Sequence, residues 1–150
     1  FPDAIIIVDP KGNDYSKYNG VDIITPNVSE FELVVGVWCD ENELREKASD
    51  FLAAYDIKYL LLTRSEQGMS LFSLKNGNFE AIDMPSDVQD VADVTGAGDT
   101  VIATLGYSIA QGSSIRDAAL LANRAAGVVV GQRGTSQIKI ADISPFISWS

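Results

Sequence analysis

Residues 93–100 read Asp-Val-Thr-Gly-Ala-Gly-Asp-Thr and lead directly into an amphipathic helix that apolar spacing predicts over residues 97–111. Small residues before a helix let backbone N–H groups approach an anion, and the helix start adds roughly half a positive charge. The segment lacks the Gly-Lys-Ser/Thr of a Walker loop and the Gly-x-Gly-x-x-Gly of a dinucleotide fold. It therefore predicts an anion-binding helix start of another kind.

Asp99, within this segment, allows two interpretations. Aspartate is a favoured N-cap, so the residue can simply begin the helix. As a carboxylate beside an anion site it can instead take the proton of a hydroxyl that attacks a phosphoryl group, a role typically worth roughly 10²- to 10⁴-fold in rate. The pattern alone favours the cap and leaves the catalytic role open.

Two further junctions carry polar side chains after a predicted strand. Thr25-Pro26-Asn27-Val28-Ser29-Glu30 places a carboxamide and a carboxylate three residues apart, which suits a Mg²⁺-bound phosphate and equally suits a helix cap with its partner. Thr63-Arg64-Ser65-Glu66-Gln67-Gly68 runs from a buried strand to a glycine, where open α/β sheets bind ligands. A plain turn explains the second junction as well.

Strands and helices alternate along the first half of the chain, and a hairpin and two helices follow. The periodicity predicts strands at 4–8, 22–25, 57–63, 69–74 and 79–84, and helices from Ser29 to Val35, from Asp40 for about four turns, at 97–111 and at 114–130. The Asn-Gly pair at 76–77 marks the hairpin. This order predicts an α/β protein with a parallel or mixed sheet covered by helices, in a single domain. The apolar run at 4–8 resembles a central strand whose lead-in is missing, so we expect the chain to be part of a longer protein.

The composition excludes several classes of protein. With 46% hydrophobic residues, the chain of 150 residues can form a core. Its 21 acidic and 11 basic side chains give a charge of −10, which argues against a nucleic-acid partner. It has no apolar run of about 18 residues, so we expect no membrane association. The absence of His excludes Ser-His-Asp, Cys-His and His-metal sites, and the single cysteine, Cys39, favours a reducing, cytoplasmic setting.

In combination, these segments resemble the C-terminal half of the PfkB (ribokinase-like) carbohydrate kinases. The block at 93–100 is similar to that family's C-terminal signature, and the likeness runs from about Ile5 to Ser136. Within the family, Asp-Pro-Lys-Gly at 9–12, Thr-Pro-Asn-Val-Ser-Glu-Phe-Glu at 25–32, Thr-Arg-Ser-Glu-Gln-Gly-Met at 63–69 and Asn-Arg-Ala-Ala-Gly-Val-Val-Val-Gly at 123–131 look most like the heptose-7-phosphate kinases.

The resemblance implies roles for the glycine-rich segment. Asp99 matches the family's catalytic base, which deprotonates the sugar hydroxyl. Gly96, Ala97 and Gly98 match the anion hole for the transferring phosphoryl group.

It also implies where cations and phosphates bind. Asn27 and Glu30 match the motif that organises Mg²⁺ and the nucleotide phosphates, with Glu30 acting on the metal through water. Lys11 is a further phosphate contact. Asp93 and Thr95 match positions that hold a monovalent cation such as K⁺ in many relatives.

For the nucleotide, Thr63, Ser65 and Gly68 fall where the family contacts ATP, and Asn123 falls where it lines the adenine pocket. The implied fold is a three-layer α/β/α arrangement with a mostly parallel central sheet. Residues 1–150 would be its ATP-binding and catalytic-base half, without the N-terminal half that carries the sugar contacts and the lid.

The implied activity is ATP-dependent phosphorylation of a sugar hydroxyl, with heptose 7-phosphate converted at O1 to the 1,7-bisphosphate for ADP-heptose and lipopolysaccharide core synthesis. We expect the full-length protein to be a homo-oligomer and these residues alone to be inactive. A following adenylyltransferase domain needs a His-rich motif, which this chain lacks. Two alternatives stay open: another PfkB kinase, for ribose, fructose phosphate, a nucleoside or a vitamin precursor, and a non-catalytic nucleotide-binding module.

Overall fold

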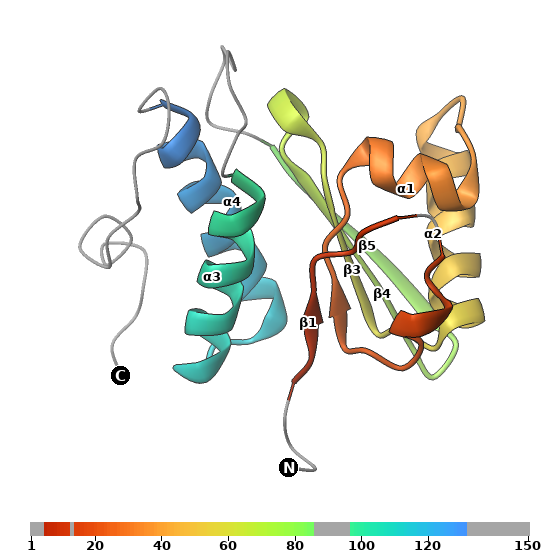
Figure 1. Cartoon of the computed structure of the whole chain (residues 1–150), viewed down its shortest axis with the longest axis horizontal. Coiled ribbons are helices and arrows are strands. Elements are labelled where there is room, and N and C mark those ends of the chain that lie inside the picture. The colour runs from red at the N-terminus through yellow and green to blue at the C-terminus, as the bar shows by residue number, and fades with distance from the viewer. Residues whose placement is uncertain (1–4, 13, 86–96, 132–150) are drawn as a thin grey trace. The chain divides into compact units, whose positions relative to one another are not determined.

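The computed structural model describes residues 5–12, 14–85 and 97–131 (Figure 1). The chain forms two compact units. The first is built from residues 1–64 and 70–83 and contains most of the sheet with two helices. The second is built from residues 65–69 and 84–150 and contains a helical pair.

The sheet has the strand order β1-β2-β3-β4-β5. Its strands are β1 (Ile7–Val8), β2 (Ile23–Ile24), β3 (Tyr59–Thr63), β4 (Met69–Lys75) and β5 (Asn78–Met84). The first three strands run parallel, with Ile7 opposite Ile23 and Ile24 opposite Leu60. Parallel pairing puts the carboxyl ends of these three strands at one edge of the sheet, which is where the predicted polar junctions follow them.

β4 and β5 form the hairpin that the Asn-Gly pair predicts. Asn76 and Gly77 connect the two strands, and both have positive φ, 53° and 80°. Two left-handed residues are what a two-residue type I′ turn requires, because its twist matches that of the flanking strands. The Leu74 N–H donates to the Lys58 carbonyl oxygen at 3.3 Å, which joins the hairpin to the segment leading into β3.

Helices α1 (Val28–Val35) and α2 (Glu41–Tyr55) pack on the sheet (Figure 1). The predicted start of the first helix at Ser29 is wrong: its N-cap is Asn27, whose side-chain oxygen accepts from the Glu30 N–H. Ser29 has Glu32 at the same capping-box spacing, but Asn27 prevails because its parallel bridge with Thr63 keeps the backbone extended up to this residue, as an N-cap requires. The second helix begins as predicted, with Asp40 as its N-cap.

The core of the first unit lies between α2 and the sheet. One side of α2 is buried, as its periodicity predicts, and contributes Leu44, Ala48, Phe51 and Leu52. These side chains belong to a cluster that includes Ile24, Leu60 and Leu62 of the sheet. Each fully buried Leu or Phe stabilises the fold by about 1.5–3 kcal/mol, far more than a helix propensity supplies.

β1 is shorter than the predicted strand and lies at the end of the described sheet rather than at its centre. Ile5 and Ile6 are exposed, at 44% and 52%. Ile6 is nevertheless held, because its N–H donates to Asp22 Oδ2 at 2.8 Å and its carbonyl accepts from the Ile23 N–H at 3.0 Å. The α/β class and the mostly parallel sheet are otherwise as predicted.

The second unit contains α3 (Ala97–Ala110) and α4 (Ile115–Gly131), which pack side by side (Figure 1). Val101 and Leu105 of α3 are buried, as are Ala118 and Ala122 of α4. Both helices agree with the predicted ranges to within one residue. Among the described residues, none of the helices combines the length and the apolar character that crossing a bilayer demands.

Two glycine-to-alanine substitutions are expected to change stability in opposite directions. A Cβ at Gly77 or at Gly106 would meet nothing within 4 Å, so neither change causes a clash. Gly77→Ala forces an L-residue into the left-handed region and should lower the free energy of unfolding by about 1 kcal/mol. Gly106→Ala lies within α3 and should raise it by about 0.5–1 kcal/mol. Urea unfolding midpoints measure both, and shifts of the same sign would contradict this account of the turn.

Candidate active site

The candidate site begins where the parallel strands end. The Thr25 N–H and hydroxyl both donate to the Val8 carbonyl oxygen, at 3.0 and 3.3 Å, and tie the end of β2 to the end of β1. Asn27 forms a parallel bridge with Thr63, and the Thr63 N–H donates to the Pro26 carbonyl oxygen at 3.0 Å. The structure therefore brings Asn27 and Thr63 together, although 36 positions separate them in the sequence.

Asn27 and Glu30 form a complete capping box at the start of α1. Asn27 Oδ1 accepts from the Glu30 N–H at 2.8 Å, and Glu30 Oε1 accepts from the Asn27 N–H at 2.9 Å. The capping interpretation of this pair is thus correct for the structure. The cap uses one carboxylate oxygen of Glu30, and Oε2 has no hydrogen bond to any of the described residues.

The donor set at this edge fits a hydrated Mg²⁺. A carboxylate oxygen beside an amide oxygen is the kind of oxygen ligand that this cation takes, and it keeps several waters when few protein groups reach it. Within the described part of the chain no cluster of three or more acidic, His or Cys side chains could chelate a metal. The residues present therefore suit a cation held largely through water and phosphate rather than a protein cage.

Lys11 lies in the loop after β1, where both its side chain and its backbone make contacts. Its ammonium pairs with Asp9 Oδ2 at 3.3 Å, and its backbone N–H donates to the Tyr18 hydroxyl at 3.1 Å. The same hydroxyl lies 3.5 Å from the Lys11 carbonyl oxygen, to which it donates. Tyr18 therefore holds the loop that carries Lys11, a role that no motif in the sequence indicates.

Tyr15 is a second residue that the sequence reasoning missed. Its side chain is fully buried, and its hydroxyl has no hydrogen-bond partner among the described residues. Burial raises the pKa of Tyr15 well above its usual value, and the nearby negative charge of Glu30 raises it further. The hydroxyl thus stays protonated. The ring packs edge-on against Tyr18, Phe51 and Tyr55, with ring centroids 5.4, 5.8 and 6.5 Å away, and this packing holds Tyr15 in the core of the unit.

Ser65 and Gly68 occupy the turn between β3 and β4, which contains a short 3-10 helix (Ser65–Gln67). The Gly68 N–H donates to the Ser65 carbonyl oxygen at 3.0 Å, and both residues have positive φ, 57° and 87°. A left-handed conformation is ordinary for Gly68 and uncommon for Ser65. The segment is thus a defined turn, and Ser65 is its strained position.

The remaining predicted residues belong to the second unit. Asn123 in α4 donates from Nδ2 to the Pro85 carbonyl oxygen at 3.0 Å. Ala97, Gly98 and Asp99 are the first three residues of α3. The predicted residues Asp93, Thr95 and Gly96 lie outside the described residues.

Comparisons with known proteins match this chain over most of its length. The pfkB family carbohydrate kinase profile matches residues 3–141. A Photorhabdus laumondii protein named "Bifunctional protein HldE" is 51% identical over 133 residues, which are 89% of this chain and 27% of that protein. The chain thus spans under a third of this curated relative.

Solved structures of similar fold include two ribokinases. That of Thermotoga maritima has a TM-score of 0.79 at 22% identity and is matched over 96% of this chain and 49% of its own. That of Arabidopsis thaliana, solved with ribose and ATP, has a TM-score of 0.77 at 22% identity over 97% of this chain and 48% of its own. The predicted ribokinase-like fold is confirmed.

Replacing Asn27 tests its role at the start of α1. Asn27→Ala removes the oxygen that accepts from the Glu30 N–H and should lower the free energy of unfolding by about 1 kcal/mol. Asn27→Asp keeps an acceptor and adds a charge that suits the helix N-terminus, so its stability should stay close to that of the wild type. Denaturant titration measures both, and equal losses in the two variants would refute the capping role.

Proposed function

Because the chain belongs to the pfkB family of carbohydrate kinases, we propose that residues 1–150 are the nucleotide-binding and catalytic-base half of an ATP-dependent sugar kinase. The family match over residues 3–141 carries this proposal. The edge formed by β1, β2 and β3 supports it, because ligands of open α/β sheets bind outside the carboxyl ends of the strands.

In this proposal Asp99 is the general base. It would accept the proton of the attacking sugar hydroxyl, while backbone N–H groups of Gly96, Ala97 and Gly98 would stabilise the charge on the transferring phosphoryl group. Phosphoryl transfer needs mainly positioning and charge neutralisation. A chain without His can therefore supply the protein groups that this reaction requires.

The nucleotide would bind along the strand ends. Thr63, Ser65 and Gly68 would contact ATP, Lys11 would contact a phosphate, and Asn123 would line the adenine pocket. These assignments rest on the family resemblance, and the pairing of Asn27 with Thr63 is consistent with a shared role.

Cations would complete the site. Bound Mg²⁺ would neutralise phosphate charge, and Glu30 and Asn27 would hold it through water. Asp93 and Thr95 would hold a monovalent cation such as K⁺. The chain has a net charge of −10, which repels the phosphates of ATP. We therefore expect ATP to bind together with a cation.

For the substrate, we propose heptose 7-phosphate, phosphorylated at O1 to the 1,7-bisphosphate that ADP-heptose and lipopolysaccharide core synthesis require. The four motifs similar to heptose-7-phosphate kinases support this choice over ribose, fructose phosphate or a nucleoside. The 51% identity to the Photorhabdus laumondii protein extends over 133 residues, well beyond those motifs.

The sugar contacts and the lid would come from an N-terminal half outside these residues. The chain matches 49% of the Thermotoga maritima ribokinase, which agrees with a division of the kinase into two halves. Residues 1–150 alone should therefore turn over little or no sugar phosphate, and a normal kcat from them would refute this division.

Substitution of Asp99 tests the catalytic base. In the full-length kinase, Asp99→Asn should lower kcat by about 10²- to 10⁴-fold, because the amide cannot accept the hydroxyl proton. Asp117→Asn is a matched control, since Asp117 is exposed and is likewise the third residue of a helix, α4.

Steady-state assays over a panel of sugars and sugar phosphates identify the substrate in the same experiment. Full activity of Asp99→Asn would reject the base. Preference for another sugar would reject heptose 7-phosphate while leaving the kinase assignment intact. Absence of transfer to every acceptor, with ATP still bound, would favour a nucleotide-binding module.

Glu30→Gln separates the capping role of this residue from its role in cation binding. The glutamine carbonyl can still accept from the Asn27 N–H, so the free energy of unfolding should change by less than about 0.5 kcal/mol. Loss of the negative charge should weaken Mg²⁺-dependent ATP binding by about tenfold or more.

Calorimetric titration with ATP, once in Mg²⁺ and once in EDTA, measures ATP binding with and without the cation. In EDTA, wild type and variant should bind ATP equally weakly. Equal binding by the wild type in Mg²⁺ and in EDTA would show that the cation is not required.

A further inference from the structure

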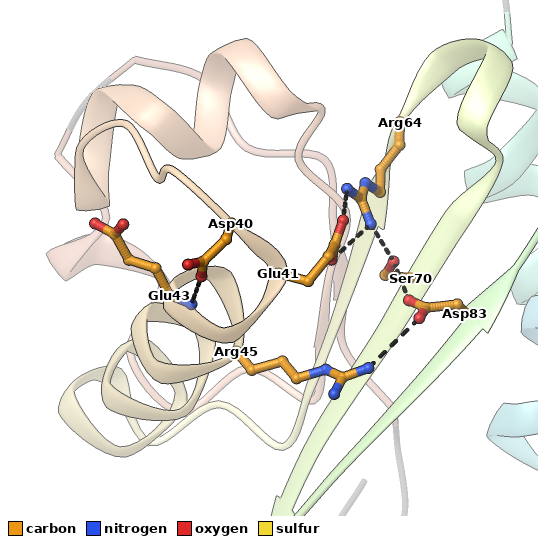
Figure 2. Close-up of polar contacts among 7 residues, drawn as sticks. All are labelled: Asp40, Glu41, Glu43, Arg45, Arg64, Ser70 and Asp83. Carbon is orange, nitrogen blue, oxygen red and sulfur yellow. Dashed lines mark hydrogen bonds and ion pairs between the residues drawn. The ribbon is translucent and has the colours of Figure 1, made fainter.

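An ionic hydrogen-bond network lies beside the turn between β3 and β4 (Figure 2). Arg64 donates from Nη2 to Glu41 Oε1 and from Nη1 to both Glu41 Oε2, at 3.3 Å, and Ser70 Oγ, at 3.1 Å. The Ser70 hydroxyl in turn donates to Asp83 Oδ1 at 2.7 Å, and Asp83 Oδ2 pairs with Arg45 at 3.7 Å. The network therefore links α2, the end of β3, β4 and β5.

Each partner of Arg64 is fixed by its own element. Glu41 lies in the first turn of α2, which is capped because Asp40 Oδ1 accepts from the Glu43 N–H at 2.8 Å (Figure 2). Ser70 is 1% exposed within β4. The guanidinium therefore has one acceptor on a capped helix and another on a buried strand. Its five N–H donors form a rigid fork, so it can donate to Glu41 and to Ser70 at the same time.

Stability alone explains the burial of Arg64 poorly. Its side chain is only 12% exposed, and its Nε is buried without a hydrogen-bond partner among the described residues. Desolvating a guanidinium carries a large cost, and Glu41 is 55% exposed, so solvent screening limits what the ion pair returns. A charged residue kept at such a position is better explained by the geometry that it imposes.

That geometry concerns the turn itself. Arg64 and Ser70 stand immediately before and after residues 65–69, so their 3.1 Å hydrogen bond closes the base of the turn. The first residue inside it, Ser65, has a φ of 57°. A left-handed conformation is unfavourable for a non-glycine residue, and it persists only where the surroundings impose it.

We propose that Arg64 is a positioning residue for nucleotide binding: held by Glu41 and Ser70, it fixes the turn of residues 65–69 in the conformation that presents Ser65 and Gly68 to ATP. This inference rests on the proposed kinase function. Arg64 itself makes no contact with the nucleotide. Its contribution is to keep the turn in its bound conformation before ATP arrives, which lowers the ordering cost of binding.

The test compares Arg64→Ala and Arg64→Lys with a matched control in the full-length kinase. Lys58→Ala removes another ion pair of the same unit, with Asp22 Oδ1 at 3.1 Å, just before the amino end of β3. Arg64→Ala should raise KM for ATP about tenfold and leave kcat and KM for the sugar within about twofold. Arg64→Lys should fall between it and the wild type, because one ammonium cannot reproduce the fork. Lys58→Ala should leave KM for ATP unchanged.

Amide hydrogen exchange without ATP supplies a readout independent of activity. In Arg64→Ala the Gly68 N–H, which is bonded to Ser65, should exchange about tenfold faster, because the turn opens more often. Should Arg64→Ala fail to fold, Glu41→Gln removes the charge that holds the guanidinium while leaving α2 capped, and it should raise KM for ATP in the same direction.

The outcomes separate the two levels of the proposal. A wild type that does not bind MgATP would overturn the kinase function and this inference together. A wild type that binds MgATP, with Arg64 and Glu41 variants that lose only melting temperature, would overturn the positioning role alone. Equal rises in KM for ATP and for the sugar would also overturn it, because they would indicate general loosening of the fold.

Discussion

Parallel pairing of β1, β2 and β3 is the constraint on which the candidate site depends. Because parallel strands share a direction, everything that follows them emerges at the same edge. The hydrogen bonds of Thr25 to Val8 and of Thr63 to Pro26 extend this pairing past the regular strands. Backbone bonds, rather than side-chain contacts, therefore bring together residues from distant parts of the sequence. At this edge the capping box leaves Glu30 Oε2 without a hydrogen bond to the described residues.

The capping box shows how one residue can serve both the fold and the chemistry. A helix start leaves backbone N–H groups without partners, and Asn27 and Glu30 satisfy two of them. That arrangement also fixes the Glu30 carboxylate without using Oε2. The structural and the chemical interpretations of this pair, which are rivals in the sequence, are therefore compatible in the structure. A carboxylate already held by one oxygen needs little reorganisation to act through the other.

The sequence predicted those parts of the molecule that local patterns determine. The Asn76-Gly77 pair specifies the turn of the hairpin, and Asp40 specifies the start of α2. The apolar spacing within α2 specifies which face of that helix is buried. The N-cap of α1 was misplaced by two residues, because Asn27 with Glu30 and Ser29 with Glu32 both have capping-box spacing, and only the bridge of Asn27 to Thr63, far away in the sequence, distinguishes them. The roles of Tyr18 and Arg64 could not be predicted at all. Their partners are seven and 23 positions away, and a lone tyrosine or arginine carries no signal of that pairing.

The absence of His and the acidity of the chain acquire a common explanation if the proposed function is correct. A reaction that relies on positioned donors, one carboxylate base and a cation needs no group that titrates near neutral pH. The charge of the phosphates would then be stabilised locally, by the start of a helix and by the bound metal. The net charge of −10 on the rest of the chain is tolerated, because salt screens it over about 10 Å. Arg64 fits the same logic: Glu41 neutralises its charge within the network, so it would position the turn of residues 65–69 without itself binding the nucleotide.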